Sequence, residues 1–162
     1  PYKVFHANVI SYGDPLEIYT EKDGEVIFKK YSPMGDLTDL AVQICEAIYK
    51  NTGHIAAVAD RDTIIAAAGL PRRELIDKHN AHDLEQIMEQ RSIYRHTPGE
   101  TKLRVTDSTD KYYIGVAAPI ISEGDLMGCT MILSDSDSKL FGETEQKLAQ
   151  TVSGFLGRQM ES

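Results

Sequence analysis

Residues 112–133 read YYIGVAAPIISEGDLMGCTMIL, and this stretch decides the fold that the sequence predicts. Its two runs, 112–121 and 127–133, are rich in apolar and β-branched residues, which favour strands. Residues 122–125, SEGD, separate them, and Gly124 can adopt the left-handed backbone of a tight turn. Gly128 suits a position where two backbones approach closely. The stretch therefore predicts two strands joined by a turn.

Helical periodicity surrounds this hairpin. Apolar residues recur at spacings of three and four over 36–51, where Asp36 can cap the start and Gly53 suits the end. Further helices are predicted at about 71–78, at 80–91 with Asn80 as its cap, and at 142–160. The last is expected to bury Leu148, Val152, Phe155, Leu156 and Gln159.

Additional strands are predicted at 54–59 and 63–66, and weaker ones within 93–106. This order of elements indicates an α+β domain in which helices flank an antiparallel sheet.

Composition and charge exclude several classes of protein. The chain has 162 residues, of which 41% are hydrophobic, and this is ordinary globular composition. No apolar run is long enough to predict a membrane span, and no N-terminal pattern indicates a signal peptide, so we expect a cytoplasmic protein. Cys45 and Cys129 lie in apolar runs and are expected to be buried free thiols.

The N-terminal part predicts a separate hairpin. Short strand-like runs at 16–19 and 26–28 flank a segment that contains Asp23-Gly24, a strong signal for a tight turn. Pro33 and Gly35 indicate a linker. We therefore expect a hairpin segment over residues 1–33 and a larger domain over residues 36–162.

The C-terminal half resembles a known domain family. GVAAPI at 115–120, Gly124, Gly128, Phe141 and then Glu145 with Leu148 follow the pattern of the closing half of a GAF domain. In that pattern an apolar strand reaches a proline, a glycine turn leads to a second strand, and a phenylalanine introduces the final helix. The resemblance implies a GAF-like antiparallel sheet and a role as a sensor of a small molecule.

The N-terminal hairpin resembles a second family. GDPLEIY at 13–19, DGEVI at 23–27 and KKYSP at 29–33 are similar to the second half of an AbrB-type swapped-hairpin domain. Together, the two parts resemble sporulation transcription regulators of spore-forming bacteria, which join an AbrB-type DNA-binding domain to a GAF domain. The resemblance implies strand exchange between chains and a homo-oligomer, either a dimer or a tetramer.

The DNA-reading half of that family has no counterpart here. Residues 1–12 contain Lys3 as their only lysine or arginine, so no phosphate-contacting residues can be carried over. The formal net charge of −8 also opposes binding of a polyanion. We therefore expect DNA to be a partner of the intact protein rather than of this 162-residue chain alone. We also expect the segment 1–12 to be altered or incomplete.

A sensor pocket is expected between the sheet and residues 70–91. Arg91, Arg95 and Arg104 are candidates for binding a carboxylate or phosphate, although charged edge residues also protect sheets from pairing. The sequence names no cofactor. The predicted ligand-binding residues are Val58, Ala66, Ile87, Met88, Arg91 and Ala117.

The two long helices, 36–51 and 142–160, are also expected to meet partner chains, because the resemblance implies oligomerisation through GAF helices. A helix that serves both a core and a partner leaves apolar surface exposed on the monomer. The predicted interface residues are Leu40, Ile44, Ala149, Val152 and Phe155.

Catalytic and metal sites have weaker support. Residues 79–83, HNAHD, offer fewer ligands than a closed metal site needs, and helix capping by Asn80 or Asp83 is the alternative. Asp60 and Asp62 suit a turn better than acid–base catalysis. We predict a protein that is neither an enzyme nor a metal binder. A small GAF-fold enzyme such as a sulfoxide reductase, which needs a reactive cysteine, and a ligand-free oligomerisation scaffold remain alternatives.

Overall fold

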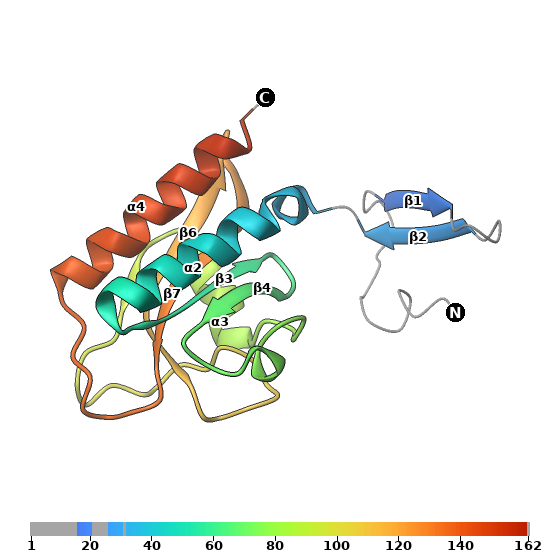
Figure 1. The fold of residues 1–162 in the computed structure, drawn as a ribbon. Coiled ribbons are helices and arrows are strands. Elements are labelled where there is room, and N and C mark those ends of the chain that lie inside the picture. The colour runs from blue at the N-terminus through green and yellow to red at the C-terminus, as the bar shows by residue number, and fades with distance from the viewer. Residues whose placement is uncertain (1–15, 21–25, 31, 162) are drawn as a thin grey trace.

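A computed structural model describes residues 16–20, 26–30 and 32–161 of the chain (Figure 1). The segment 1–12 and the Asp23-Gly24 turn lie outside the described residues. In chain order the elements are β1 (Leu16–Thr20), β2 (Val26–Lys30), the 3₁₀ helix η1 (Pro33–Leu37), α2 (Thr38–Thr52), β3 (Ile55–Asp60), β4 (Ile64–Ala68), the 3₁₀ helix η2 (Arg72–Glu74), α3 (His82–Gln90), β5 (Tyr94–Arg95), β6 (Tyr113–Ser122), β7 (Asp125–Ser134) and α4 (Glu143–Gln159).

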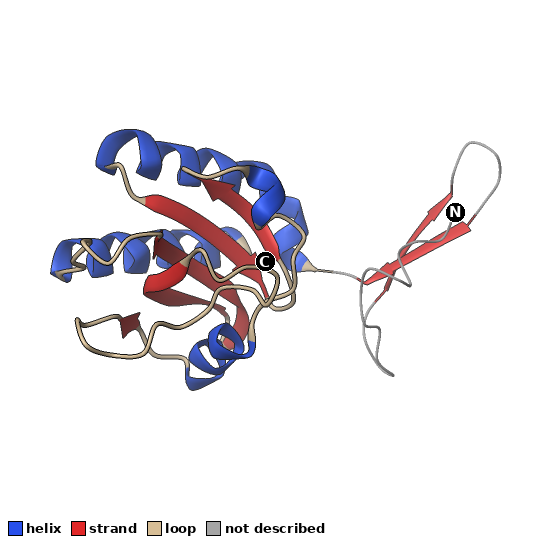
Figure 2. Cartoon of the chain, turned by 90° about the horizontal axis from the view of Figure 1, so that it is seen from below, coloured by secondary structure: helices blue, strands red, loops and turns tan. Residues whose placement is uncertain are grey.

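The strands form two separate antiparallel sheets. Among the described residues, β1 pairs with β2, as the N-terminal prediction expected, and the other five strands form a sheet in the order β4-β3-β7-β6-β5. Every neighbouring pair in this larger sheet is antiparallel. Helices cover both of its faces (Figure 2). The predicted α+β class, a helix-flanked antiparallel sheet, is confirmed.

The hairpin of β6 and β7 forms where the sequence predicted it. Ser122 pairs with Asp125, and the two residues between them have positive φ angles, 50° at Glu123 and 85° at Gly124. Two successive positive φ angles are typical of the type I′ turn, whose twist matches that of the strands. A Cβ atom at Gly128 would collide with the carbonyl oxygen of Ala59, so glycine allows β7 to lie this close to β3.

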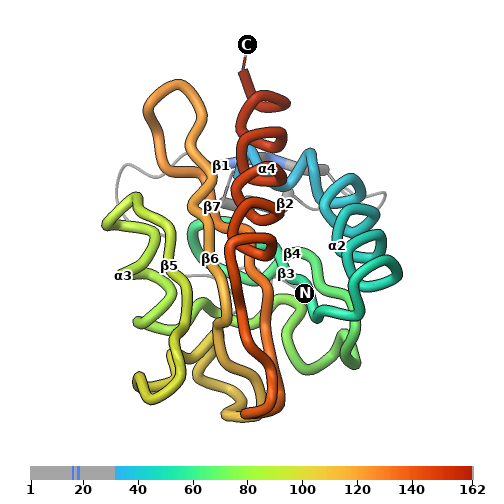
Figure 3. Tube along the Cα trace, turned by 90° about the vertical axis from the view of Figure 1, so that its left-hand side faces the viewer, coloured from blue at the N-terminus to red at the C-terminus, as the bar shows by residue number. Residues whose placement is uncertain are grey.

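Two packing faces result from the alternation of side chains along the strands. On the α2–α4 face, α4 lies along β6 and β7 while α2 lies beside β3 and β4 (Figure 3). On the opposite side, the α3 face, lie α3 and the segment that contains η2. Ala57 and Ala59 of β3 pack on the α3 face, whereas Ala56 and Val58 pack on the α2–α4 face.

Several predicted helix boundaries and faces need correction. Asp36 lies inside η1 and α2 begins at Thr38, although Gly53 ends the helix in a left-handed conformation as expected. The helix expected at 71–78 is only the short η2, followed by turns. Phe155 and Gln159 are exposed rather than buried, because they lie on the side of α4 that faces away from the sheet.

The small sheet exposes apolar side chains. Leu16 and Ile18 of β1 are 43% and 66% exposed. A two-stranded hairpin is marginally stable by itself in water, so such side chains are normally covered by further structure. In the described part of the chain, no helix has both the length and the apolar content that a membrane span requires.

Candidate functional site

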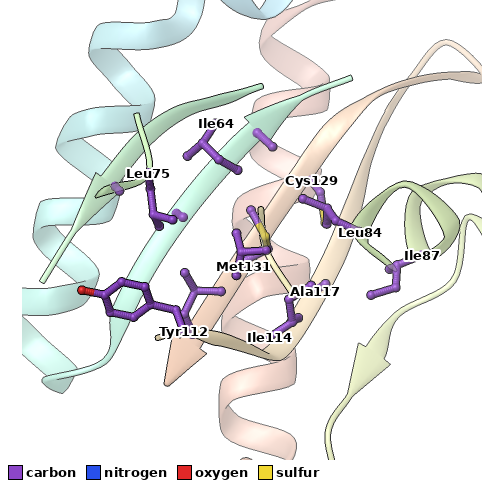
Figure 4. Packing of buried hydrophobic residues seen from close by; sticks show 14 of the residues in the cluster. Ile64, Leu75, Leu84, Ile87, Tyr112, Ile114, Ala117, Cys129 and Met131 are labelled. Carbon is purple, nitrogen blue, oxygen red and sulfur yellow. The ribbon is translucent and has the colours of Figure 1, made fainter. Parts of the chain in front are cut away.

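The α3 face is the place where the sequence predicted a ligand. Figure 4 shows part of its core: Leu75 from the segment after η2, Leu84 from α3, and Ile114 and Met131 from the sheet. Met88 of α3 belongs to the same core. These side chains are almost completely buried. The protein's own residues therefore pack this face, and a ligand entering it would displace part of that packing.

Polar bonds fix the short elements of the α3 face. The Tyr112 hydroxyl donates to a carboxylate oxygen of Glu74, and the backbone N–H of Arg104 donates to Asp83 Oδ2 at 2.9 Å. The bond from Tyr112 lowers the pKa of the Glu74 carboxyl. Burial, followed by the bond to Glu74, raises the pKa of Tyr112. These bonds attach η2 and α3 to the residues around the start of β6.

The predicted ligand residues do not line one space. Ile87, Met88 and Ala117 pack together on the α3 face. Val58 and Ala66 are paired across β3 and β4, but both lie in the core of the α2–α4 face. The prediction that all six residues line a single pocket is therefore wrong, because strand alternation directs Val58 and Ala66 to the other side of the sheet.

The three arginines have separate surroundings. Arg91 ends α3 with a positive φ of 55° and donates from Nη1 to the carbonyl oxygen of Gly124 at 2.6 Å. Arg104 pairs with Asp110 at 2.7 Å. Arg95 is exposed on the edge strand β5. Of the three, Arg91 adjoins the α3 face most directly, through the end of α3 and the β6–β7 turn.

A shallow groove of about 390 Å³ lies between α2 and the end of β4. Half-exposed Tyr49 packs against Gly69, where a Cβ atom would lie 2.7 Å from the Tyr49 ring. The sequence did not predict this groove, because its helical residues mix apolar with charged side chains and carry no motif. The groove is lined by Val42, Glu46, Tyr49, Lys50, Ala67, Ala68, Gly69, Leu70 and Arg72.

The histidine-containing segment has structural partners. The expected cap at Asn80 is wrong: the residue before α3 is Ala81, and the Asn80 side chain donates instead to the carbonyl oxygen of Asp60 at 3.0 Å. Asp83 binds the backbone of Arg104, as described above. Within the residues that the structure describes, no three His, Cys, Asp or Glu side chains gather as metal ligands would.

Asp60 has the turn chemistry that the sequence indicated. Its Oδ1 atom accepts hydrogen bonds from the backbone N–H groups of Asp62 and Thr63, both at 2.8 Å. This arrangement closes the turn between β3 and β4. The carboxylate therefore organises the backbone of the turn.

The two cysteines of the chain are completely buried. Burial raises the pKa of the Cys45 thiol to about 12 and also raises the pKa of Cys129. A nucleophilic cysteine needs solvent access and a thiolate that forms near neutral pH. Neither thiol has these properties, which weighs against cysteine chemistry.

The residues predicted for an interface between chains differ in their exposure to solvent. Ala149 and Val152 are buried against the sheet, and Leu40 and Ile44 are partly buried in the core of the α2–α4 face. Phe155 alone among them leaves a large apolar area in solvent, at 45% exposure. The helix-side interface prediction therefore depends on Phe155.

Comparison with known families decides the identity. Residues 36–161 match the family described as "Stage V sporulation protein T C-terminal, transcription factor". The chain belongs to this family. It is also 38% identical over 149 residues to stage V sporulation protein T of Bacillus subtilis strain 168, a match that covers 92% of this chain and 83% of the relative.

Solved structures show the same fold at low sequence identity. A type II free methionine-R-sulfoxide reductase from Thermoplasma acidophilum gives a TM-score of 0.57 at 11% identity, covering 80% of this chain and 95% of that one. The GAF domain of a phosphoenolpyruvate-protein phosphotransferase from Coxiella burnetii gives 0.56 at 16% identity, covering 76% and 82%. The cofactor-binding GAF domain of the nutrient sensor CodY from Clostridium difficile gives 0.50 at 9% identity, covering 74% and 83%. The larger sheet with its helices therefore has the GAF fold.

Proposed function

We propose that this chain is the sensor and oligomerisation part of a DNA-binding transcription regulator of sporulation that acts in the cytoplasm. The match of residues 36–161 to the sporulation transcription factor family carries this proposal. The GAF fold supports the sensor role, since a neighbour with this fold is described as the cofactor-binding domain of a nutrient sensor.

A small molecule would act through the α3 face and modulate the DNA-binding heads of the intact protein. Ile87, Met88 and Ala117 already pack together there, and Arg91 lies at the end of α3. A ligand shifts a conformational equilibrium only when it binds one arrangement better than the other. The polar bonds of Glu74 and Asp83 to neighbouring segments define the arrangement that such a ligand would favour or disrupt.

The sensor proposal is tested by adding fractionated small-molecule extracts from sporulating cells to the chain and measuring thermal unfolding. We expect one fraction to raise the melting temperature, and expect Met88→Ala to weaken that rise while Leu156→Ala, at an equally buried position in the core of the α2–α4 face, leaves it unchanged. A ligand that stabilises both variants equally would place the site elsewhere. No stabilising fraction would favour the scaffold alternative, which the dense packing of the α3 face supports.

Homo-oligomerisation, as a dimer or a tetramer, would use apolar surface that the monomer exposes. Phe155 of α4 offers one such area, and Leu16 with Ile18 of the AbrB-type hairpin offers another. We expect Phe155→Ser to lower the assembly state measured by analytical ultracentrifugation, without unfolding the chain. The exposed loop variant Leu140→Ser is the matched control, and equal behaviour of the two variants would contradict a specific role for Phe155.

An enzymatic role is the second candidate, because a free methionine-R-sulfoxide reductase shares the fold. The buried thiols of Cys45 and Cys129 oppose it. We expect a bulky thiol reagent to modify the native chain at least about a hundredfold more slowly than the urea-unfolded chain, because burial suppresses thiolate formation and access. Rapid modification of one cysteine in the native chain would favour the enzyme.

A further inference from the structure

We propose that Asp60 is a positioning residue that couples the start of α3 to the junction between the N-terminal hairpin and the GAF domain, through its backbone carbonyl on the α3 side and its carboxylate on the junction side. The junction is Ser32, which follows β2 after one residue and immediately precedes η1. The regulatory meaning of this coupling rests on the proposed function, because it assumes that a ligand acts on the α3 face. The coupling itself can be measured without a ligand.

The first half of the connection joins Ser32 to Asp60. Ser32 Oγ donates to Asp60 Oδ2 at 3.2 Å, across a sequence separation of 28 residues. A serine at the start of a helix normally bonds to that helix's own backbone. Ser32 stands at the N-cap of η1 and makes no such side-chain bond. Its hydroxyl is therefore directed to the GAF sheet rather than to its own helix.

Asp60 is well placed to hold a fixed orientation. It is 9% exposed, and its second oxygen, Oδ1, accepts the two backbone bonds that close the β3–β4 turn. Its backbone lies against Gly128 of β7, where a Cβ atom would come within 3.1 Å of the Asp60 Cα. Both the carboxylate and the backbone of Asp60 are held in place. A displacement of the β3–β4 turn therefore moves Asp60 Oδ2 and redirects its hydrogen bond to Ser32.

The second half of the connection joins Asp60 to α3. The buried Asn80 side chain donates to the Asp60 carbonyl oxygen at 3.0 Å, and Asn80 itself forms a β-bridge with Thr106. Ala81, which follows directly, is the N-cap of α3. A shift at the start of α3 therefore reaches Ser32 through Asp60, by the hydrogen bond from Asn80 to the Asp60 carbonyl and the hydrogen bond from Ser32 to the Asp60 carboxylate.

Apolar side chains also attach the junction to the GAF domain. Met34 of η1 is completely buried in the core of the α2–α4 face, on the side of the sheet away from α3. Apolar packing is not directional, so it anchors η1 without reporting the position of α3. The hydrogen bond from Ser32 to Asp60 supplies the directional link.

Hydrogen exchange on the 162-residue chain tests the coupling as a double-mutant cycle. Asn80→Ala removes the bond to Asp60 and is expected to speed exchange about fivefold at 79–84, the factor that a hydrogen bond of ordinary net strength supplies. A two- to fivefold increase is also expected at 33–37. In a Ser32→Ala background, Asn80→Ala should still speed exchange at 79–84 but leave 33–37 unchanged.

The controls separate coupling from a general loss of structure. Ser32→Thr retains the hydroxyl and should restore the response at 33–37, whereas Ser138→Ala, in an exposed loop, should leave the wild-type response intact. If Asn80→Ala does not fold, Asn80→Ser serves instead, since its hydroxyl is too short to reach Asp60. The proposal is overturned if 33–37 responds equally with and without the Ser32 hydroxyl, or does not respond in the wild-type background.

Failure of this cycle would remove Asp60 as the connector and leave the sensor function open. Conversely, if the cycle shows coupling but no small molecule stabilises the chain, Asp60 remains the connector and the proposed ligand-sensing function fails. If both hold, the stabilising fraction should change exchange at 33–37 in the wild-type chain and not in Ser32→Ala.

Discussion

The two faces of the GAF sheet are built in different ways. On the α2–α4 face, helices that span Thr38–Thr52 and Glu143–Gln159 lie along the strands and bury apolar side chains. On the α3 face, the cover is the much shorter helix His82–Gln90, the 3₁₀ turn η2 and connecting segments. Hydrogen bonds of Glu74, Asn80 and Asp83 attach this cover to its surroundings.

This difference in construction predicts a difference in stability: the α2–α4 face should be the stable support, and the α3 face should open locally more easily. Long helices packed on a sheet unfold cooperatively, whereas short elements held by a few polar bonds can open locally at lower free energy. A sensor needs both properties. Under the proposed sensor function, the α3 face would be the ligand-responsive part and the α2–α4 face the support.

The sharpest way to break this comparison is a matched pair of leucines. Leu84 of α3 and Leu156 of α4 are both completely buried. We expect Leu156→Ala to lower the free energy of unfolding by about 4 kcal/mol and Leu84→Ala by about 2–3 kcal/mol, because the shorter elements can collapse further into the cavity. Urea denaturation measures both values, and an equal or larger loss at Leu84 would refute the distinction.

A second pair tests how closely α4 contacts the sheet. A Cβ atom at Gly157 would collide with the carbonyl oxygen of Ile121, whereas one at Gly154 would meet nothing within 4 Å. Gly157→Ala should therefore destabilise the chain by about 2 kcal/mol through overpacking. Gly154→Ala should stabilise it by up to about 1 kcal/mol through helix propensity. Thermal and urea unfolding read out both, and equal effects would contradict the close approach.

The smallest expected effect concerns the start of α4. Glu145 Oε1 accepts the backbone N–H of Gly142 at 2.7 Å, and Oε2 lies 3.3 Å from His54 Nε2. The bond from Gly142, with a smaller contribution from His54, lowers the pKa of Glu145. Its stabilisation is therefore complete above the unfolded-state pKa and is lost as pH falls through the lower folded-state value.

Glu145→Gln should accordingly cost about 0.5–1 kcal/mol at pH 7, the usual range for a charge at a helix N-terminus. The difference from wild type should shrink as pH falls from 5 to 3, when followed by urea denaturation at each pH. Glu143→Gln removes an exposed carboxylate from the same helical turn and controls for net charge. Parallel pH profiles for wild type and Glu145→Gln would count against this contribution.

Much of the fold follows from local patterns that the sequence displays. The run from Tyr112 to Leu133 predicts the central hairpin because apolar strands and a glycine turn are short-range signals. The late strand pair and terminal helix also carried the resemblance to GAF domains, which the fold confirms. The candidate site was less predictable. Which side of the sheet a residue faces depends on how the strands pair, and residue type alone does not show this.

By itself, the sequence determined the long helices, the central strand pair, the glycine turn at Gly124 and the α+β class, since periodicity and turn chemistry act over a few residues. Tertiary structure alone decided that Val58 and Ala66 face away from α3, that Phe155 remains in solvent, and that Asn80 bonds to Asp60 instead of capping α3. Each of these outcomes depends on which distant segments lie side by side. Spacing along the chain cannot specify such neighbours, because they are selected by packing and hydrogen bonding over the whole domain.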